Sequence, residues 1–303
     1  MGAQLRAVRQ RIRSTQSIAK ITRAQELIAA SRIIRAQQRV RAATPYAREL
    51  ERAVTAVVSR SASIDHPLVR EPAQRERAAV LIITSDRGFC GSYNANVLRR
   101  AQELRTLLAD QQVSVDTYVT GAKGIGWHRF RGRELAGEWS GGSDNPGQGR
   151  AQEITSTLLE AFRQPNEEGG VNEIHLVYTE FVSMLTQRPV VRRILPLEVE
   201  ETTEEPPSGP VPLYEFEPSP EAVLDALLPW YVENRVYHAL LESAASEIAE
   251  RRRAMKAATD NANDLLEQFT LEANKARQAE ITQEISEIVG GANALAESIA
   301  GSE

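Results

Sequence analysis

The sequence predicts an α/β protein in which two long terminal helices pair as an antiparallel coiled coil around a small inserted domain. Three observations predict it. Both ends of the 303-residue chain are long stretches with few helix breakers, their apolar positions recur in steps of three and four, and the middle alternates strands with helices. We expect a coiled-coil helix at 1–60, an α/β domain at 75–200, an acidic, proline-rich linker at 201–220 and a second coiled-coil helix at 221–303.

The amino-terminal helix carries a seam of apolar or small residues. From Gln4 to Ala43 there is no glycine or proline, and Glu26 is the one charged residue on the seam. We expect the helix to continue to about Arg60, with a break or cap at Thr44–Pro45. The seam positions are Leu5, Val8, Ile12, Thr15, Ala19, Thr22, Ala29, Ile33, Ala36 and Val40.

The carboxyl-terminal helix carries a matching seam, interrupted by Arg252. Its positions are Leu241, Ala245, Ile248, Met255, Thr259, Ala262, Leu266, Phe269, Ala273 and Ala276. Two seams at opposite ends of a compact insertion predict antiparallel pairing within the chain. If Gln25 lies beside Arg251, the amino terminus reaches only about Lys275.

Beyond that level the apolar positions change phase. They become Ile285, Ile288, Ala292, Leu295 and Ile299. A change of phase indicates that the helix stops facing its internal partner. An apolar helix face without an internal partner predicts contact with another protein.

The central domain is expected to be a small, Rossmann-like and mostly parallel sheet covered by helices. The last strand follows a connection too short for a crossover helix, so it is expected to be antiparallel. The expected strands are Ala78–Thr84, Val113–Thr120, Glu173–Phe181 and Val190–Glu200, and the expected helices are 94–109, 123–130 and 150–162.

Composition excludes several classes of protein. The single cysteine, Cys90, excludes an intrachain disulfide, and the four histidines form no ligand motif, so we expect no metal and no cofactor. No apolar run is long enough to cross a bilayer, and the amino terminus does not resemble a signal peptide, so we expect a cytosolic protein. Thirteen basic residues stand against three acidic ones through Arg60. This excess predicts either a solvated face neutralised by the acidic partner helix, or contact with acidic surfaces of other subunits or with nucleic acid.

Two loops follow strands, where α/β proteins bind ligands. The glycines of 121–126 do not follow the GxGxxG order, so we expect a strand-to-helix turn in which glycine relieves crowding. The segment 85–92 holds an acid, a base and a thiol. No histidine is near Cys90 in sequence, so we expect a structural loop in which Asp86 caps turn amides and pairs with Arg87 or a neighbour.

Several segments together resemble one family, the gamma subunits of F-type ATP synthase. The matching segments are Met255–Ala262 (MKAATDNA), Asn274–Ile285 (NKARQAEITQEI), Ser85–Gly91 (SDRGFCG) with Asn94, and Lys20–Ala24 (KITRA) with Ala29–Ser31. They fall in order along essentially the whole chain. The resemblance implies a central rotor shaft that is not an enzyme by itself and couples proton-driven rotation to ATP synthesis.

The resemblance also implies partners and contact residues. The partners are an α3β3 hexamer, an epsilon subunit and a membrane c-ring, with one copy of this chain per complex, located peripherally at the cytoplasmic face of the plasma membrane. Arg277, Gln278 and Thr282 match residues that contact a beta subunit. Gln25 stands where methionine is usual, and Arg251 matches the arginine coupled to it. We expect further subunit contacts at Gln25, Arg251, Ile285, Ile288 and Leu295.

Two other functions are compatible with parts of the sequence. One is a Rossmann-like enzyme with helical dimerisation arms, which the absence of a proper phosphate loop disfavours. The other is a coiled coil that binds nucleic acid through the basic amino-terminal helix. Its first forty residues contain no aromatic side chain for base stacking, so we expect no nucleic-acid partner.

Overall fold

The computed structural model describes residues 2–60, 75–197 and 217–300, with the side chains of 4–58, 75–197 and 217–292. Most of the predicted linker therefore lies outside the described residues. The elements are α1 (Gly2–Arg60), β1 (Arg77–Ile83), α2 (Tyr93–Asp110), β2 (Ser114–Thr120), α3 (Ala122–Phe130), β3 (Gly137–Trp139), α4 (Gln148–Arg163), a 3-10 turn η1 (Asn166–Glu168), β4 (Glu173–Phe181), β5 (Gln187–Leu195) and α5 (Pro220–Ala300).

The chain forms two compact units. One comprises residues 1–28 and 253–303, and the other comprises residues 29–252, so α1 and α5 each contribute to both. The expected break at Thr44–Pro45 is wrong, because α1 continues through Pro45. Proline removes one backbone donor, and the burial of Leu50 and Val54 beyond it holds the helix together.

The larger unit contains a five-stranded sheet of order β3-β2-β1-β4-β5. Three of the strand pairs are parallel, and β5 runs antiparallel to β4, as predicted. Strand β3 is not predicted by the sequence, because three residues carry no periodic signal. The last strand was expected at Val190–Glu200, but β5 begins at Gln187 and ends at Leu195.

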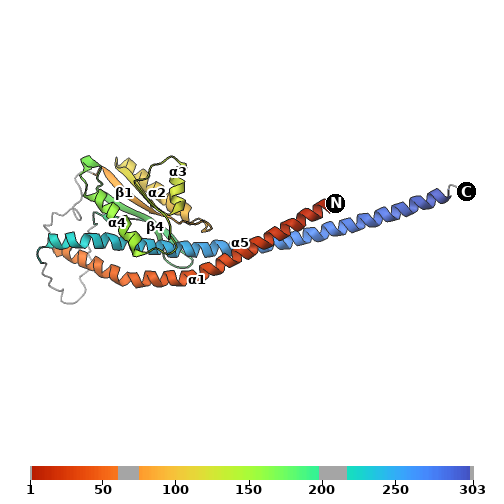
Figure 1. The fold of residues 1–303 in the computed structure, drawn as a ribbon, viewed down its shortest axis with the longest axis horizontal. Helices are drawn as coiled ribbons and strands as arrows, with labels where there is room; N and C mark the ends of the chain where they lie inside the picture. The colour runs from red at the N-terminus through yellow and green to blue at the C-terminus, as the bar shows by residue number, and fades with distance from the viewer. Residues whose placement is uncertain (1, 61–74, 198–216, 301–303) are drawn as a thin grey trace. The chain divides into compact units, whose positions relative to one another are not determined.

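Helices cover both faces of this sheet (Figure 1). On one face, alternate residues of β1 such as Val80 pack against α2 and α3. On the other face, Leu81 and its neighbours pack against α4, the end of α1 and the beginning of α5. Strand β1 is therefore buried on both faces, which explains its continuous apolar sequence.

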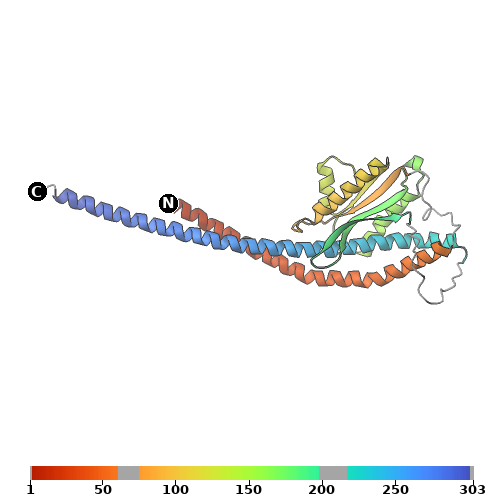
Figure 2. The same ribbon diagram turned by 180° about the vertical axis from the view of Figure 1, so that it is seen from behind.

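Within the same unit α1 and α5 lie side by side (Figure 2), and small side chains fill their contact. The contact consists of Ala29, Ile33 and Ala36 of α1 and Ala245, Ile248 and Ala249 of α5. Alanine allows the helix backbones to approach closely. These residues confirm the predicted seams of this unit.

In the smaller unit the two helices again pair in opposite directions. Burial follows the predicted seams: Leu5, Val8, Thr15 and Thr22 are buried on α1, and Met255, Thr259 and Ala262 are buried on α5. The hydroxyl of Thr259 donates to that of Thr22 at 2.8 Å. The guanidinium of Arg11 lies 5.9 Å from the centre of the Phe269 ring.

These two contacts determine the register. In an antiparallel pair the residue numbers of partners have a nearly constant sum, so Thr22–Thr259 places Gln25 level with Lys256. The expected level at Arg251 is therefore wrong by five residues. Helix α1 consequently covers α5 to about Glu280 rather than Lys275. Periodicity specifies which residues face the partner, but a shift along the seam leaves that pattern unchanged.

Glycine allows a close approach between β1 and the beginning of α3. Gly121 has φ +103°, and a Cβ there would lie 2.3 Å from the backbone oxygen of Thr84. At Gly124 a Cβ would lie 2.6 Å from the Thr84 hydroxyl, which accepts the Gly124 N–H at 3.0 Å. The predicted relief of crowding is thus confirmed at Gly121 and Gly124 and is wrong at Gly126, where a Cβ would meet nothing within 4 Å.

Gly121→Ala is expected to destabilise the chain by about 3 kcal/mol or more, because it combines an unfavourable φ with a backbone clash. Urea denaturation followed by circular dichroism measures the change. Gly126→Ala is the matched control, since a Cβ there meets nothing within 4 Å, and it should stabilise α3 by about 0.5–1 kcal/mol. Equal stabilities of the two variants would contradict this account.

Candidate functional site

The end of α5 is the first candidate site. Of the predicted seam, Leu266, Phe269, Ala273 and Ala276 are half-buried, and Glu280 is the last partly covered residue among the side chains described, which end at Ala292. Every residue from Ile281 to Ala292 is exposed. Helix α5 continues past the amino-terminal end of α1 within this unit (Figure 1). This segment therefore lacks a cover among the described residues.

The exposed segment has one apolar face. Ile281, Ile285, Ile288 and Val289 are all exposed, Ile288 by 71%. Their spacing of four, three and one places them together on a helix, about a third of a turn from the seam. The predicted change of phase is thus present in the structure, and the segment can offer apolar side chains to another protein.

The predicted contact residues share this face. Arg277, Gln278 and Thr282 are exposed, and Arg277 lies one turn before Ile281. The Thr282 hydroxyl donates to the backbone oxygen of Gln278 at 2.9 Å. The amide of Gln278 and the guanidinium of Arg277 are the groups that can bind a partner's carboxylate or carbonyl. The side chain of Leu295 lies outside the described residues.

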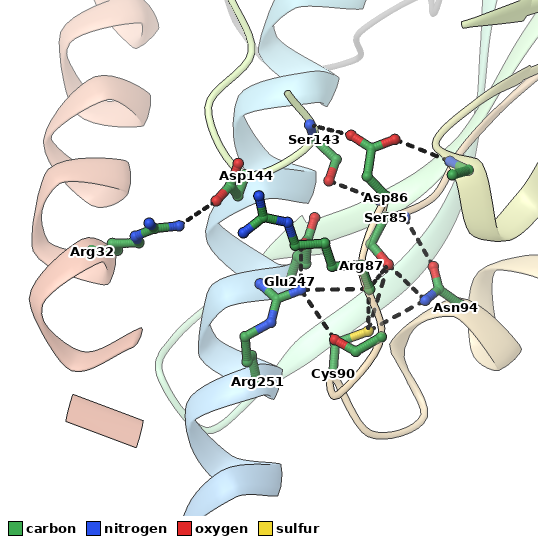
Figure 3. Close-up of polar contacts among 12 residues, drawn as sticks. Arg32, Ser85, Asp86, Arg87, Cys90, Asn94, Ser143, Asp144, Glu247 and Arg251 are labelled. Atoms are coloured by element: carbon green, nitrogen blue, oxygen red, sulfur yellow. Dashed lines mark hydrogen bonds and ion pairs between the residues drawn. The ribbon is translucent and has the colours of Figure 1, made fainter. Parts of the chain in front are cut away.

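Gln25 and Arg251 are in different surroundings. Gln25 is exposed on the smaller unit. Arg251 belongs to the larger unit, where it donates to Glu247 at 2.7 Å and to the backbone oxygen of Gly88 at 3.3 Å (Figure 3). Arg251 therefore joins α5 to the loop that follows β1.

The buried carboxylate of Glu247 needs the Arg251 guanidinium as its counter-charge. It is 1% exposed, and Arg251 is its ion-pair partner. Burial raises the pKa of Glu247, and the Arg251 charge opposes that shift. Glu247 was not among the predicted site residues, although its spacing of four from Arg251 on a helix is a usual ion-pair signal.

The loop itself is held by a polar network around Asp86 (Figure 3). The Asp86 carboxylate accepts the backbone N–H groups of Ala122, Gly141 and Ser143 at 2.9–3.0 Å. Burial would raise the pKa of Asp86, but these donors outweigh it and lower the pKa. The prediction that Asp86 caps backbone amides is confirmed. The capped amides belong to the segments after β2 and β3, and not to the loop 85–92 that contains Asp86.

Cys90 has a structural position in the same loop. Its thiol is buried, 3.6 Å from the Ser85 hydroxyl and 3.3 Å from the Asn94 side-chain nitrogen. Burial raises the pKa of Cys90, so the thiolate needed for a nucleophile is disfavoured. Asn94 also accepts the Ser85 N–H at 2.9 Å, which ties α2 to the end of β1. The loop thus serves as a rigid support for Arg251.

A second ion pair ties α1 to the same region. Arg32 donates to Asp144 at 2.5 Å, next to the loop that Asp86 holds (Figure 3). This pair could not be predicted from local sequence, since 112 residues separate the partners. The larger unit therefore connects both long helices to the loops at the carboxyl end of its sheet.

Arg251→Ala is expected to destabilise the chain by about 3–5 kcal/mol, because it leaves the buried Glu247 carboxylate without its cation. Urea denaturation measures the loss. Adding Glu247→Gln should recover a large part of it, whereas Arg252→Ala, an exposed neighbour, should change stability by less than about 0.5 kcal/mol. A double variant no more stable than Arg251→Ala would contradict the assigned pairing.

Comparison with known proteins identifies the family. Residues 4–295 match the family model described as ATP synthase. The ATP synthase gamma chain of Acidothermus cellulolyticus is 61% identical over 97% of this chain and 98% of its own length. That of Thermobifida fusca is 60% identical over 100% of both chains.

Solved structures share the fold at low sequence identity. A chain of the Euglena gracilis mitochondrial ATP synthase, in a structure of OSCP, F1 and c-ring, has a TM-score of 0.65 at 16% identity and covers 97% of this chain and 95% of its own length. A chain of the Tetrahymena thermophila central stalk and c-ring has a TM-score of 0.59 at 23% identity, over 78% of this chain and 99% of its own. The match over nearly the full length at 61% identity decides the assignment: the chain belongs to the family of ATP synthase gamma chains.

Proposed function

We propose that this chain is the rotor shaft that couples proton-driven rotation of a membrane ring to conformational change at catalytic subunits during ATP synthesis. The observation that carries the proposal is the bare face of α5 from Ile281 to Ala292, which follows directly on the paired seam. A helix that packs on a partner helix along its first part and is exposed along the part that follows is suited to contact surrounding subunits.

The proposed mechanism depends on asymmetry. A single helix end inside a threefold ring presents a different face to each of three equivalent subunits. A partner shifts a conformational equilibrium only through contacts that differ between the states. Turning the shaft would exchange the three sets of contacts. In this proposal the chain supplies no catalytic residue, and the chemistry belongs to the ring.

The partners and contact residues are part of the proposal. The partners would be three alpha and three beta subunits, an epsilon subunit and the c-ring. Arg277, Gln278 and Thr282 would contact a beta subunit, with Gln25, Ile285, Ile288 and Leu295 as further contacts. Arg251 would act indirectly, since its side chain is bound to Glu247 and the loop carbonyls.

The proposed location is peripheral, at the cytoplasmic face of the plasma membrane, with one copy per complex. Among the described residues, no helix is both long and apolar enough to span a membrane. Attachment would therefore run through the c-ring in this proposal.

Purification of the native complex through a tag on this chain tests the proposed assembly. Quantitative mass spectrometry should recover three alpha and three beta copies for each copy of this chain. An untagged strain gives the background. Recovery of the chain alone, or with two copies of itself per complex, would contradict the proposal.

Arg277→Ala with Gln278→Ala is expected to reduce ATP-driven proton pumping by about tenfold, since removing a charge-assisted hydrogen bond costs roughly 1.5–3 kcal/mol. Quenching of a pH-sensitive dye in inverted vesicles measures pumping, and immunoblotting measures assembly. The control is Glu272→Ala, an exposed residue on the paired part of α5, which should pump normally. Normal assembly and pumping by the double variant would rule out the assigned contact.

A further inference from the structure

Arginines and aromatic side chains gather on the larger unit where α3 ends. Helix α3 covers the face of the sheet opposite the two long helices and ends at Phe130 (Figure 1). The Phe130 side chain is 88% exposed, whereas the Trp127 indole packs partly against the core beneath α3. The sequence 127–133 (WHRFRGR) thus places one exposed and one anchored aromatic ring among three arginines.

A glycine turn brings two of these arginines to one ring. Gly132 follows the end of α3 with φ +63°, a left-handed conformation. Its N–H donates to the backbone oxygen of Arg129 at 3.0 Å, and the N–H of Arg133 donates to that of His128 at 3.1 Å. This pair of bonds is a common way to end a helix with glycine. The turn folds the chain back, so that residues on both sides of Gly132 reach Trp127.

The Trp127 ring holds the two guanidinium groups. The guanidinium carbon of Arg131 lies 4.0 Å from the ring centre, and that of Arg133 lies 5.1 Å from a ring centre of the same indole. Arg133 also donates to the side-chain oxygen of Gln102 on α2 at 2.7 Å. A stacked guanidinium keeps N–H donors at its edge. Both side chains are therefore ordered before a partner binds, which lowers the entropy cost of binding.

A third arginine, Arg105 of α2, adds its charge to this pair. Burial lowers the pKa of Arg133, and the charges of Arg105 and Arg131 lower it further. Burial also lowers the pKa of the His128 ring, and the same three arginines add to that effect. The three guanidinium groups thus lie close enough to repel one another.

No carboxylate compensates these three charges within the described part of the chain. Arg105 makes no hydrogen bond or ion pair there, and Arg131 and Arg133 donate only to uncharged oxygens. The adjacent Arg129 differs, because it is paired with Glu138 of β3. A carboxylate is therefore a suitable partner for an arginine at this place, and three arginines still lack one.

The aromatic rings indicate which kind of anionic partner fits. Trp127 is already stacked with two guanidinium groups, which disfavours stacking of a nucleic-acid base on it. Phe130 alone offers too little apolar surface to insert into a membrane. Tryptophan, phenylalanine and arginine together are, however, typical of the centre of a protein interface. An acidic polypeptide segment therefore fits best.

We propose that this basic cluster docks an acidic segment of another protein. Carboxylates of the segment bind the guanidinium groups of Arg105, Arg131 and Arg133, and an apolar side chain of the segment packs on Phe130. Acidic and apolar residues in alternation satisfy both requirements. The proposal does not use the contacts of α5, so it can hold or fail independently of the proposed rotor function.

Fluorescence anisotropy with the purified full-length chain tests the proposal. The probe is a labelled peptide that alternates glutamate with leucine, and its neutral analogue has glutamine in place of glutamate. The acidic peptide should bind saturably, and the neutral analogue should bind at least about tenfold more weakly, because charge-assisted hydrogen bonds are roughly twice as strong as neutral ones. Polyuridine RNA and phosphatidylglycerol vesicles should displace the probe less effectively than the unlabelled acidic peptide does at equal total charge.

Matched variants separate this cluster from general attraction to basic residues. Arg131→Ala should weaken binding of the acidic peptide about three- to tenfold, whereas Arg99→Ala, an exposed arginine of α2 outside the cluster, should leave it unchanged. Phe130→Ala should weaken it about threefold or more, whereas Leu107→Ala, an exposed apolar residue of α2, should have no effect. All four side chains are exposed, and circular dichroism checks that each variant folds.

Four outcomes would overturn the proposal. The folded wild-type chain does not bind the acidic peptide, or the neutral analogue binds equally well. Alternatively, the two variants of either matched pair behave alike, or RNA or vesicles displace the probe more effectively than the unlabelled peptide does.

Discussion

The structure depends on the burial of one helical segment on every side. From Leu241 to Glu250 each residue of α5 is buried, because α1 lies against one side and the sheet against another. Alanine and serine make this possible, since larger residues would hold the neighbouring elements apart. The Ser246 hydroxyl donates to the backbone oxygen of Thr179 at 3.1 Å, so even the polar side chains of the segment contribute to the contact.

This burial also explains the polar network around Arg251. Glu247 lies in the buried segment, and an unpaired carboxylate there would cost several kcal/mol. Arg251 compensates it and at the same time binds the carbonyl groups of the loop after β1. Asp86 makes that loop rigid by capping amides of two other loops. The buried Glu247 carboxylate is thus connected to the carboxyl end of the sheet through Arg251, the carbonyl groups of the loop after β1, and Asp86.

The same helix carries different constraints along its length. In the larger unit it is enclosed, in the smaller unit it has one partner, and after Glu280 it has none among the described residues. The family to which the chain belongs gives this gradient a functional meaning: the enclosed part is suited to hold the shaft, and the bare part is suited to contact other subunits.

The long helices, the buried strands and the faces that they bury can be predicted from the sequence alone. Seam periodicity predicted which residues of α1 and α5 are buried, apolar runs predicted β1 and β4, and the changed phase after Ala276 predicted the bare face of Ile285 and Ile288. These features are local, so a few adjacent turns of helix or one strand suffice to encode them.

Tertiary structure decided the register, the ion pairs and the basic cluster. The Thr22–Thr259 contact, the Arg32–Asp144 pair and the meeting of Arg105 with Arg131 and Arg133 join separate segments of the chain. A seam repeats along its length, so its pattern allows several alignments, and a charged residue in a sequence has many possible partners. Only the packing of the whole chain selects one alignment and one partner, because only there do burial and hydrogen bonding have to be satisfied together.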